Sequence, residues 1–306
     1  MLAVNKTLLK KINLFVLVLA VCSGCDGVGL DDFVPEVAVS AVLIANEPLP
    51  PVRLVLTGPI REPYDPAERS INDAQVRLQW VQENGITVDL PYVLSEEGLG
   101  IYEFASPEDS VLVEGGSTYR FEATVPGFAE PVTAETIVPN TFSVATPPPD
   151  TIFYQVGNSP RMDLTPTTYP GRQNIYMFNL RALDPENFPL TPFAADLVRD
   201  FDVDPVDLHE GNSPLLNESN YQVNPDGTIR ISIVWLAFNF YGPQRFLITT
   251  VDDALVNFIQ SQTIQFIPTT LSPGEIPNVV TNVENGLGVF GAVAQASTNA
   301  FLALAP

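Results

Sequence analysis

Proline is the residue that most restricts how this chain can fold. The sequence has 29 prolines and 19 glycines along its 306 residues. Proline inside a helix removes a backbone hydrogen bond, and glycine lowers helix stability, so the pattern disfavours long helices. Short strands joined by frequent turns fit it better. Because 45% of the residues are hydrophobic and 9% are aromatic, such strands have the side chains for a real core.

Seven strand-like runs occupy the first half of the chain. Apolar and polar residues alternate within them, as Val76, Leu78 and Trp80 do with the residues between them. This alternation is typical of antiparallel strands with one buried and one solvent-facing side. The runs predict a mostly β fold that begins with a seven-stranded sandwich, immunoglobulin-like or transthyretin-like. They cover residues 36–45, 52–57, 74–82, 86–94, 100–105, 118–125 and 132–138.

Three consecutive prolines at 147–149 predict a domain boundary. Consecutive prolines cannot donate to a sheet and hold the chain extended. The boundary separates the sandwich, residues 36–146, from a second β-rich domain, residues 147–306. The length of the chain also fits about two domains.

The second domain is predicted to hold strands and one helix near 251–262. Thr250 followed by Asp253 has the spacing of a capping box, and apolar residues then recur at helical spacing. A polar excursion at 184–221 holds at most one further short helix, at 193–199. Residues 228–240 are apolar on both faces, which predicts a central strand. The remaining predicted strands are 151–156, 174–183, 245–249, 287–294 and 300–304.

The amino terminus has the order of a secretory signal. Lys6, Lys10 and Lys11 precede an apolar run at 14–21, and small residues follow. A membrane-spanning helix needs roughly 20 apolar residues, and this run has about half that number. We therefore interpret residues 1–24 as a signal peptide rather than as a permanent membrane span.

Cys25 is the predicted lipidation site. Ser23 and Gly24 before it resemble a bacterial lipobox, in which the cysteine receives fatty acyl groups such as palmitate and becomes the first mature residue. Cys22 is an alternative acceptor, and an ordinary cleaved signal with an incidental thiol is the other interpretation. With Cys25 acylated, residues 25–35 form a tether. The predicted location is the outer membrane or cell surface.

The charge of the mature chain is strongly negative. All three lysines lie in the signal, which leaves 11 arginines against 36 acidic residues, a net charge of −25. Such a surface repels nucleic acid and anionic lipid headgroups, so nucleic acid is excluded as a partner and the membrane contact must come from the lipid. The acids are scattered, which favours a solubility role over recruitment of cations or of a basic partner.

Few residues have a pattern that predicts chemistry. His209 is the only histidine, and the sequence has no nucleophile elbow and no His-Glu-x-x-His motif. A lone histidine in a polar loop is usually a solvated surface residue. We therefore expect no catalytic residues and no cofactor.

Four aspartates form one candidate metal site. Asp200, Asp202, Asp204 and Asp207 offer the hard oxygen ligands that Ca²⁺ prefers. Pro205 stands where an EF-hand loop requires glycine, so the pattern is incomplete. A solvated acidic loop is the alternative interpretation.

Several segments resemble the domain-of-unknown-function family DUF4249, cell-surface lipoproteins typical of Bacteroidetes-type bacteria. The resemblance covers nearly the whole mature chain. It implies a lipid-anchored envelope protein, often found beside TonB-dependent outer-membrane transporters, with no established catalytic residues. The segments are 73–78, 116–121, 134–139 and, as the most specific, 278–292.

These features favour a noncatalytic accessory or ligand-binding component of the cell envelope. Its ligand, a small molecule or a glycan, is not identified by any motif. Aromatic residues between 235 and 246 offer a sugar platform, but their pattern fits a buried core better. The alternatives are an extracellular hydrolase that uses carboxylates and a structural or adhesion module.

The high negative charge makes stability depend on salt. Because ions screen repulsion between the acids, we expect the melting temperature of the purified mature domain to rise between low and molar NaCl. Thermal unfolding followed by circular dichroism at several salt concentrations measures this. A melting temperature independent of salt contradicts the interpretation.

Overall fold

The computed structural model describes residues 33–59, 62–82, 85–106, 111–155, 157–266 and 279–304. The predicted signal peptide, Cys25 and most of the predicted tether lie outside these residues. Contacts divide the chain into two units. One unit is Met1–Pro35 with Gly58–Tyr64, of which only short pieces are described. The other is Glu36–Thr57 with Asp65–Pro306, and the fold below belongs to it.

The seven predicted strands of the sandwich are confirmed. Their pairing follows the order β1-β2-β5-β4-β3-β6-β7, and each pair is antiparallel. A short helix, α2 (Pro66–Arg69), lies between β2 and β3. The strands are β1 (Val37–Ile44), β2 (Val52–Leu56), β3 (Gln75–Val81), β4 (Thr87–Leu94), β5 (Ile101–Phe104), β6 (Thr118–Thr124) and β7 (Val132–Ile137).

Alternating side chains of these strands form the first hydrophobic core. Leu78, Tyr119 and Phe121 have no more than 1% of their surface exposed. Trp80 is partly buried and stacks on Tyr119 with ring centroids 6.4 Å apart, so its ring packs against this core. The last strands, β7 and β17 (Val283–Glu284), return to contact the carboxy-terminal strand, so the sheet closes round this core.

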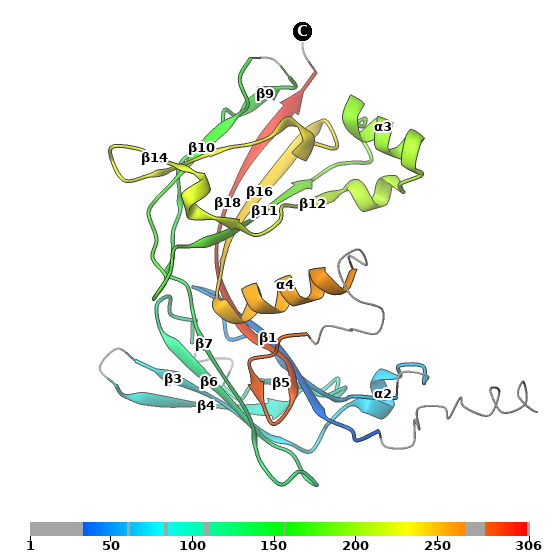
Figure 1. Cartoon of the computed structure of the whole chain (residues 1–306), viewed down its shortest axis with the longest axis vertical. Helices are drawn as coiled ribbons and strands as arrows, with labels where there is room; N and C mark the ends of the chain where they lie inside the picture. The colour runs from blue at the N-terminus through cyan, green and yellow to red at the C-terminus, as the bar shows by residue number, and fades with distance from the viewer. Residues whose placement is uncertain are drawn as a thin grey trace, which may run out of the picture. The chain divides into compact units, whose positions relative to one another are not determined.

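The carboxy-terminal strand, β18 (Leu287–Ala303), connects the sandwich to the rest of the sheet. Two strands with a break near residue 295 were predicted here, and that prediction is wrong. One edge of β18 pairs in parallel with β1, and the other pairs antiparallel with β16 (Gly242–Val251). Figure 1 shows β18 continuing through both regions. The polar residues at 295, 297 and 299 do not break the strand, because they lie on its solvent-facing side.

Gly288 makes the pairing of β18 with β1 possible. Its φ is +104°, a backbone region that favours glycine. A β-carbon at this position would come within 2.0 Å of the carbonyl oxygen of Val39. Any side chain at residue 288 therefore pushes β18 away from β1.

Beyond the sandwich, the main sheet faces a second, smaller sheet. The small sheet has the order β14-β15-β10-β8, and buried apolar side chains fill the space between the two. The predicted proline boundary lies between β8 and β9, two strands that belong to different sheets. The strands of this region, besides β16 and β18, are β8 (Val144–Thr146), β9 (Thr151–Phe153), β10 (Arg161–Leu164), β11 (Ile175–Ala182), β12 (Glu210–Asn212), β13 (Leu216–Asn217), β14 (Gln222–Val223) and β15 (Ile229–Ser232).

The predicted central strand at 228–240 is shorter than expected. Only β15 is extended, and a 3-10 helix, η5 (Trp235–Ala237), follows it. Trp235 packs edge-on against Tyr154 and tilts against the buried Phe238, which turns the chain out of the sheet. Residues 228–240 are therefore not one strand between two layers. They are a short strand followed by a turn, and the apolar side chains of the two parts point in different directions.

Three helical segments occur where the chain was expected to be mostly polar loop. Helix α3 (Pro192–Phe201) confirms the predicted short helix at 193–199. Two 3-10 helices, η3 (Pro205–Leu208) and η4 (Glu218–Asn220), follow it. None of the helices in the described ranges has an apolar stretch long enough to cross a membrane.

Helix α4 (Asp253–Phe266) confirms the predicted second-domain helix, but its cap differs from the prediction. Asp252 is the capping residue, because its Oδ1 accepts a hydrogen bond from the Leu255 amide at 2.8 Å. Thr250, the predicted cap, instead donates its hydroxyl to the Ala294 carbonyl of β18. The capping box failed because Thr250 still belongs to β16, where its backbone is committed to the sheet.

Asp252 also connects α4 to both edges of the sandwich. Its side chain is 1% exposed, its Oδ2 accepts a hydrogen bond from the Thr136 hydroxyl of β7, and its amide donates to the Ala292 carbonyl of β18. Burial disfavours the ionised carboxylate and raises its pKa to about 6.

This buried carboxyl gives a pH-dependent prediction. A pKa higher in the folded than in the unfolded chain means that the stability it contributes is complete below about pH 4 and lost as pH rises through about 6. The free energy of unfolding of wild type relative to Asp252→Asn should therefore fall by up to about 3 kcal/mol between these pH values. Urea unfolding of both proteins measures it, and a constant difference contradicts the prediction.

Candidate ligand-binding cavity

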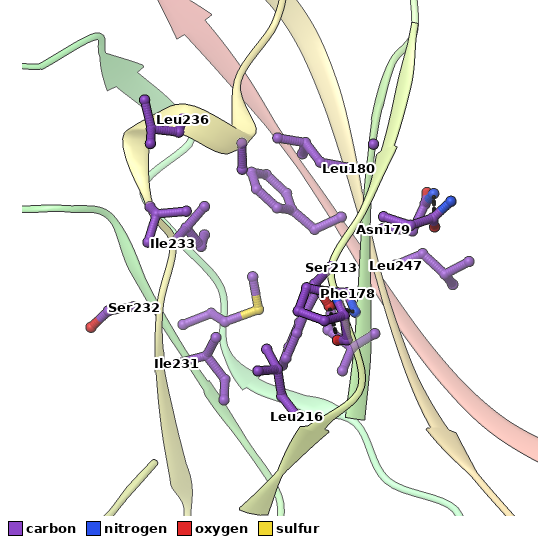
Figure 2. Close-up of a pocket in the computed structure, with 18 of the residues that line it drawn as sticks. Phe178, Asn179, Leu180, Ser213, Leu216, Ile231, Ser232, Ile233, Leu236 and Leu247 are labelled. Carbon is purple, nitrogen blue, oxygen red and sulfur yellow. Dashed lines mark hydrogen bonds between the residues drawn. The ribbon is translucent and has the colours of Figure 1, made fainter. Parts of the chain in front are cut away.

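A cavity of about 500 Å³ lies between the main sheet and the small sheet. On one side it is lined by β11 and β16, and on the other by β15 and the segment that leads into η5. Figure 2 shows Ile231 and Ile233 on one side and Phe178 and Leu180 across the cavity from them. Its volume falls within the range of pockets that hold small ligands.

The wall of the cavity is mostly apolar and carries no charged side chain among the described residues. Alternation along β11 and β16 places Phe178, Leu180, Phe246 and Ile248 on the side that faces the small sheet. Of the described residues that line it, none is Asp, Glu, His, Lys or Arg. The apolar side chains are those of Met162, Phe178, Leu180, Pro214, Leu216, Ile231, Ile233, Val234, Leu236, Ala237, Phe246, Leu247 and Ile248.

Short polar side chains and two exposed apolar ones lie at the lining's outer part. Ser213 accepts a hydrogen bond from the Phe178 amide and donates to the Pro214 carbonyl, so the loop between β12 and β13 is held on β11. Val234 and Leu236 are 61% and 58% exposed although they line the cavity. Apolar side chains that remain exposed beside an apolar cavity mark an interaction site more than isolated surface leucines do.

An aromatic cluster forms one end of the cavity. Phe178 and Tyr221, which line it, pack edge-on with centroids 5.8 Å apart, and Tyr176 stacks on Phe178 behind them. Burial raises the pKa of Tyr221 to about 12 and that of Tyr176 further, so both phenols stay neutral at physiological pH. The Tyr176 hydroxyl is buried and has no hydrogen-bond partner among the described residues.

Of the aromatic residues between 235 and 246, which were predicted to form a core, only Phe246 lines this cavity. The cavity itself was not predicted from the sequence. Phe238, Phe240, Tyr241 and Phe246 are indeed buried, which confirms the core interpretation over a sugar platform. Periodicity does not distinguish a packed core from an incompletely filled one, because both need apolar residues at the same positions. The available signal was the run Val234 to Phe238, which is too apolar for a turn.

The four candidate calcium ligands do not converge in the structure. Asp200 pairs with its neighbour Arg199, and Asp202 takes a left-handed conformation at the end of α3. Asp204 caps η3 by accepting from the Val206 amide, and Asp207 lies within that helix. Among the described residues no group of three or more His, Cys, Asp or Glu is placed to hold a metal ion.

His209 lies at the end of η3, outside the cavity. Its ring packs edge-on against Phe240 with centroids 5.4 Å apart, and its carbonyl accepts a hydrogen bond from Ala182 at the end of β11. The ring of His209 therefore packs against an apolar side chain, and its backbone holds the loop to β11. Cys25, the predicted lipidation site, is not among the described residues.

A second hollow, on the sandwich, is polar. It has a volume of about 420 Å³ and contains Glu122, Glu135 and Glu284. Glu122 pairs with Arg77, and Glu135 pairs with Arg120, both on exposed strand faces. Carboxylates that are exposed and neutralised by arginine lack the environment that prepares a catalytic acid or base.

Comparison with solved structures finds distant likenesses. The first is a tetra-tandem repeat from the extending region of a large adhesion protein, with TM-score 0.23, 11% identity and coverage of 87% of this chain and 48% of that one. For Salmonella alpha-2-macroglobulin reacted with methylamine, the TM-score is 0.24 and the identity 11%, and the match covers 88% of this chain and 15% of that one. For an I-band fragment of titin, the TM-score is 0.19 and the identity 8%, and the match covers 89% of this chain and 66% of that one. This chain thus spans less than half of the first two.

No curated protein matches the sequence. A family model does, over residues 28–299, which include β1 to β17 and most of β18. The resemblance seen in the sequence is thereby confirmed. The chain belongs to DUF4249, a family described as a domain of unknown function.

Proposed function

We propose that this protein is a noncatalytic binding component of the cell envelope, anchored by lipid on Cys25, with a ligand site in the cavity between the two sheets. The observation that carries the proposal is the cavity of about 500 Å³ without a charged side chain. Ligand sites of this size are mostly apolar, with a few polar groups that orient the ligand. Here the amide side chains of Asn212 and Asn239 lie in the lining and supply such groups.

The chemistry of the lining favours binding over catalysis. Acid–base and nucleophilic catalysis need titratable or activated groups at the reacting atoms. The described lining offers amide side chains, the hydroxyls of Ser213 and Ser232, the phenol of Tyr221 and apolar groups. The Ser213 hydroxyl is engaged with backbone groups, and burial keeps the Tyr221 phenol neutral by raising its pKa. A hydrolase that uses two carboxylates therefore gains no support from this cavity.

The anchor rests on the amino-terminal sequence. A basic start, a short apolar run and small residues before Cys25 together form the predicted signal and lipobox. The mature surface, with its net charge of −25, does not favour an anionic bilayer, so stable attachment depends on the acyl chains. Placement in the outer membrane or at the cell surface, beside a TonB-dependent transporter, follows from the family resemblance.

Filling the cavity should abolish binding of an apolar probe. We expect the uncharged dye N-phenylnaphthylamine to bind wild type with enhanced fluorescence and to bind Leu180→Trp at least about tenfold more weakly, because the indole occupies the space beside β15. Fluorescence titration measures this. Leu183→Trp, the same change at an exposed residue outside the cavity, should bind like wild type. If all three proteins bind the dye with equal affinity, the cavity is not its binding site.

Removing the acceptor sulfur should release the protein from the membrane. We expect Cys25→Ser to move from the membrane fraction to the soluble fraction, and Cys22→Ser to remain membrane-bound. Mass spectrometry of the native protein should find acyl groups on Cys25. If instead Cys22→Ser becomes soluble and Cys25→Ser stays membrane-bound, the lipid is on Cys22. If the wild-type protein is soluble and carries no acyl group, the protein has no lipid anchor.

A further inference from the structure

Strand β15 has an unpaired edge beside the cavity. Its ladder with β14 includes Arg230 and Ile229 and then stops, because the chain before Gln222 turns into η4. On its other edge, Ile233 donates its amide to Pro160, next to β10. Backbone groups alternate in direction along a strand, so those of Ser232 point toward the side that β14 leaves open.

The same side exposes the amide of Val234. Its carbonyl accepts a hydrogen bond from Ala237 within η5, but no described residue accepts from its amide or bonds the Ser232 amide and carbonyl. Ser232 thus offers one donor and one acceptor, and Val234 offers one further donor. This is the pattern that an added antiparallel strand uses.

A second unpaired edge belongs to β12, the last strand of the main sheet. Ser213 donates its amide to Phe178, and the His209 carbonyl accepts from Ala182, so the odd-numbered residues bond β11. The backbone groups of Glu210 and Asn212 therefore point away from β11. Asn212 lines the cavity, as Ser232 does, so the cavity is bordered by an unpaired edge of each sheet.

Neither charge nor proline protects the edge of β15. Natural sheets guard such edges with lysine, proline, bulges or a covering loop. Residues 232–234 are Ser-Ile-Val, and Val234 and the nearby Leu236 are more than half exposed. Unpaired backbone groups at a strand edge are a template for pairing with another chain.

We propose that the natural ligand is an extended peptide segment of a partner protein, which adds a strand to the β15 edge and inserts alternate apolar side chains into the cavity. This rests on the proposed binding role of the cavity. An acyl chain uses the apolar space but makes no hydrogen bond to the Ser232 and Val234 backbone groups, whereas a peptide uses both. The uncharged lining requires an apolar central part, and the net charge of −25 favours basic flanking residues.

The test is selection of a display library of random short peptides on the purified mature domain. Enriched sequences should alternate apolar and polar residues and carry basic ends. Methylation of their backbone nitrogens, which keeps every side chain, should weaken binding by about tenfold or more. Bound peptide should slow amide hydrogen exchange at Ser232 and Val234 in the wild-type domain.

A matched pair of variants tests the edge itself. Ser232→Pro removes the free amide donor at a strand edge, where proline is tolerated, and should weaken the selected peptides by about tenfold. Ser232→Ala keeps the backbone and should bind as wild type. Unchanged exchange at Ser232 and Val234 overturns the proposal even where Ser232→Pro does not fold.

The dye and peptide experiments together distinguish strand addition at the β15 edge from ligand binding in the cavity alone. If the dye binds wild type and not Leu180→Trp, but no alternating peptide is enriched or methylated peptides bind equally well, strand addition is wrong and the apolar site stands. If neither dye nor peptide binds, both are wrong. Displacement of the dye by fatty acid but by no selected peptide identifies a lipid ligand and overturns the proposal.

Discussion

The hydrogen-bond ladder of β18 is the interaction on which the rest of this structure depends. The strand pairs with β1 through its first part and with β16 through its last part, and Val293 is paired on both sides. Pairing with a strand fixes the register of its neighbours. Because β18 pairs with strands of both regions, it joins the sandwich and the second core in one continuous sheet. The requirement at Gly288, where Val39 leaves no room for a side chain, shows how close the approach is.

Asp252 adds a side-chain connection at the same junction. It caps α4, and it bonds β7 through Thr136 and β18 through Ala292. A buried polar group that is hydrogen-bonded to several elements specifies one arrangement of those elements, although its ionisation is disfavoured there. The helix is thus positioned by the sheet as much as by its own apolar face, which packs on Val289 and Val293.

The cavity follows from the shortness of the small sheet. β11 and β16 continue for eight and ten residues, whereas β15 has four and then turns into η5. A long sheet facing a short one leaves apolar side chains without partners, and packing forces cannot close the gap while both sheets keep their registers. The same early end of β15 leaves its edge unpaired, so the cavity and the free edge have one origin.

Local patterns made much of this fold predictable, and distant contacts did not. The sandwich strands followed from alternation within each run, and α4 from its period, because these depend on neighbouring residues. The continuity of β18 depends on strands more than 200 residues away along the chain, such as β1, and the cap of α4 depends on Thr136. The apolar residues of the cavity were identified but not their incomplete packing, which only the lengths of facing strands decide.

The surface of the protein is strongly acidic, whereas the described lining of the cavity has no charged side chain. The acids are spread over the mature chain, and several of the arginines are paired with them, as Arg230 is with Asp163 and Arg77 with Glu122. Their field acts over about a Debye length, roughly 8 Å at physiological salt, and so selects what reaches the surface. The cavity has no charged lining, and apolar contact and backbone hydrogen bonds act only at touching distance. For the binding site proposed above, selectivity would therefore come from shape and from the spacing of the backbone groups at the β15 edge.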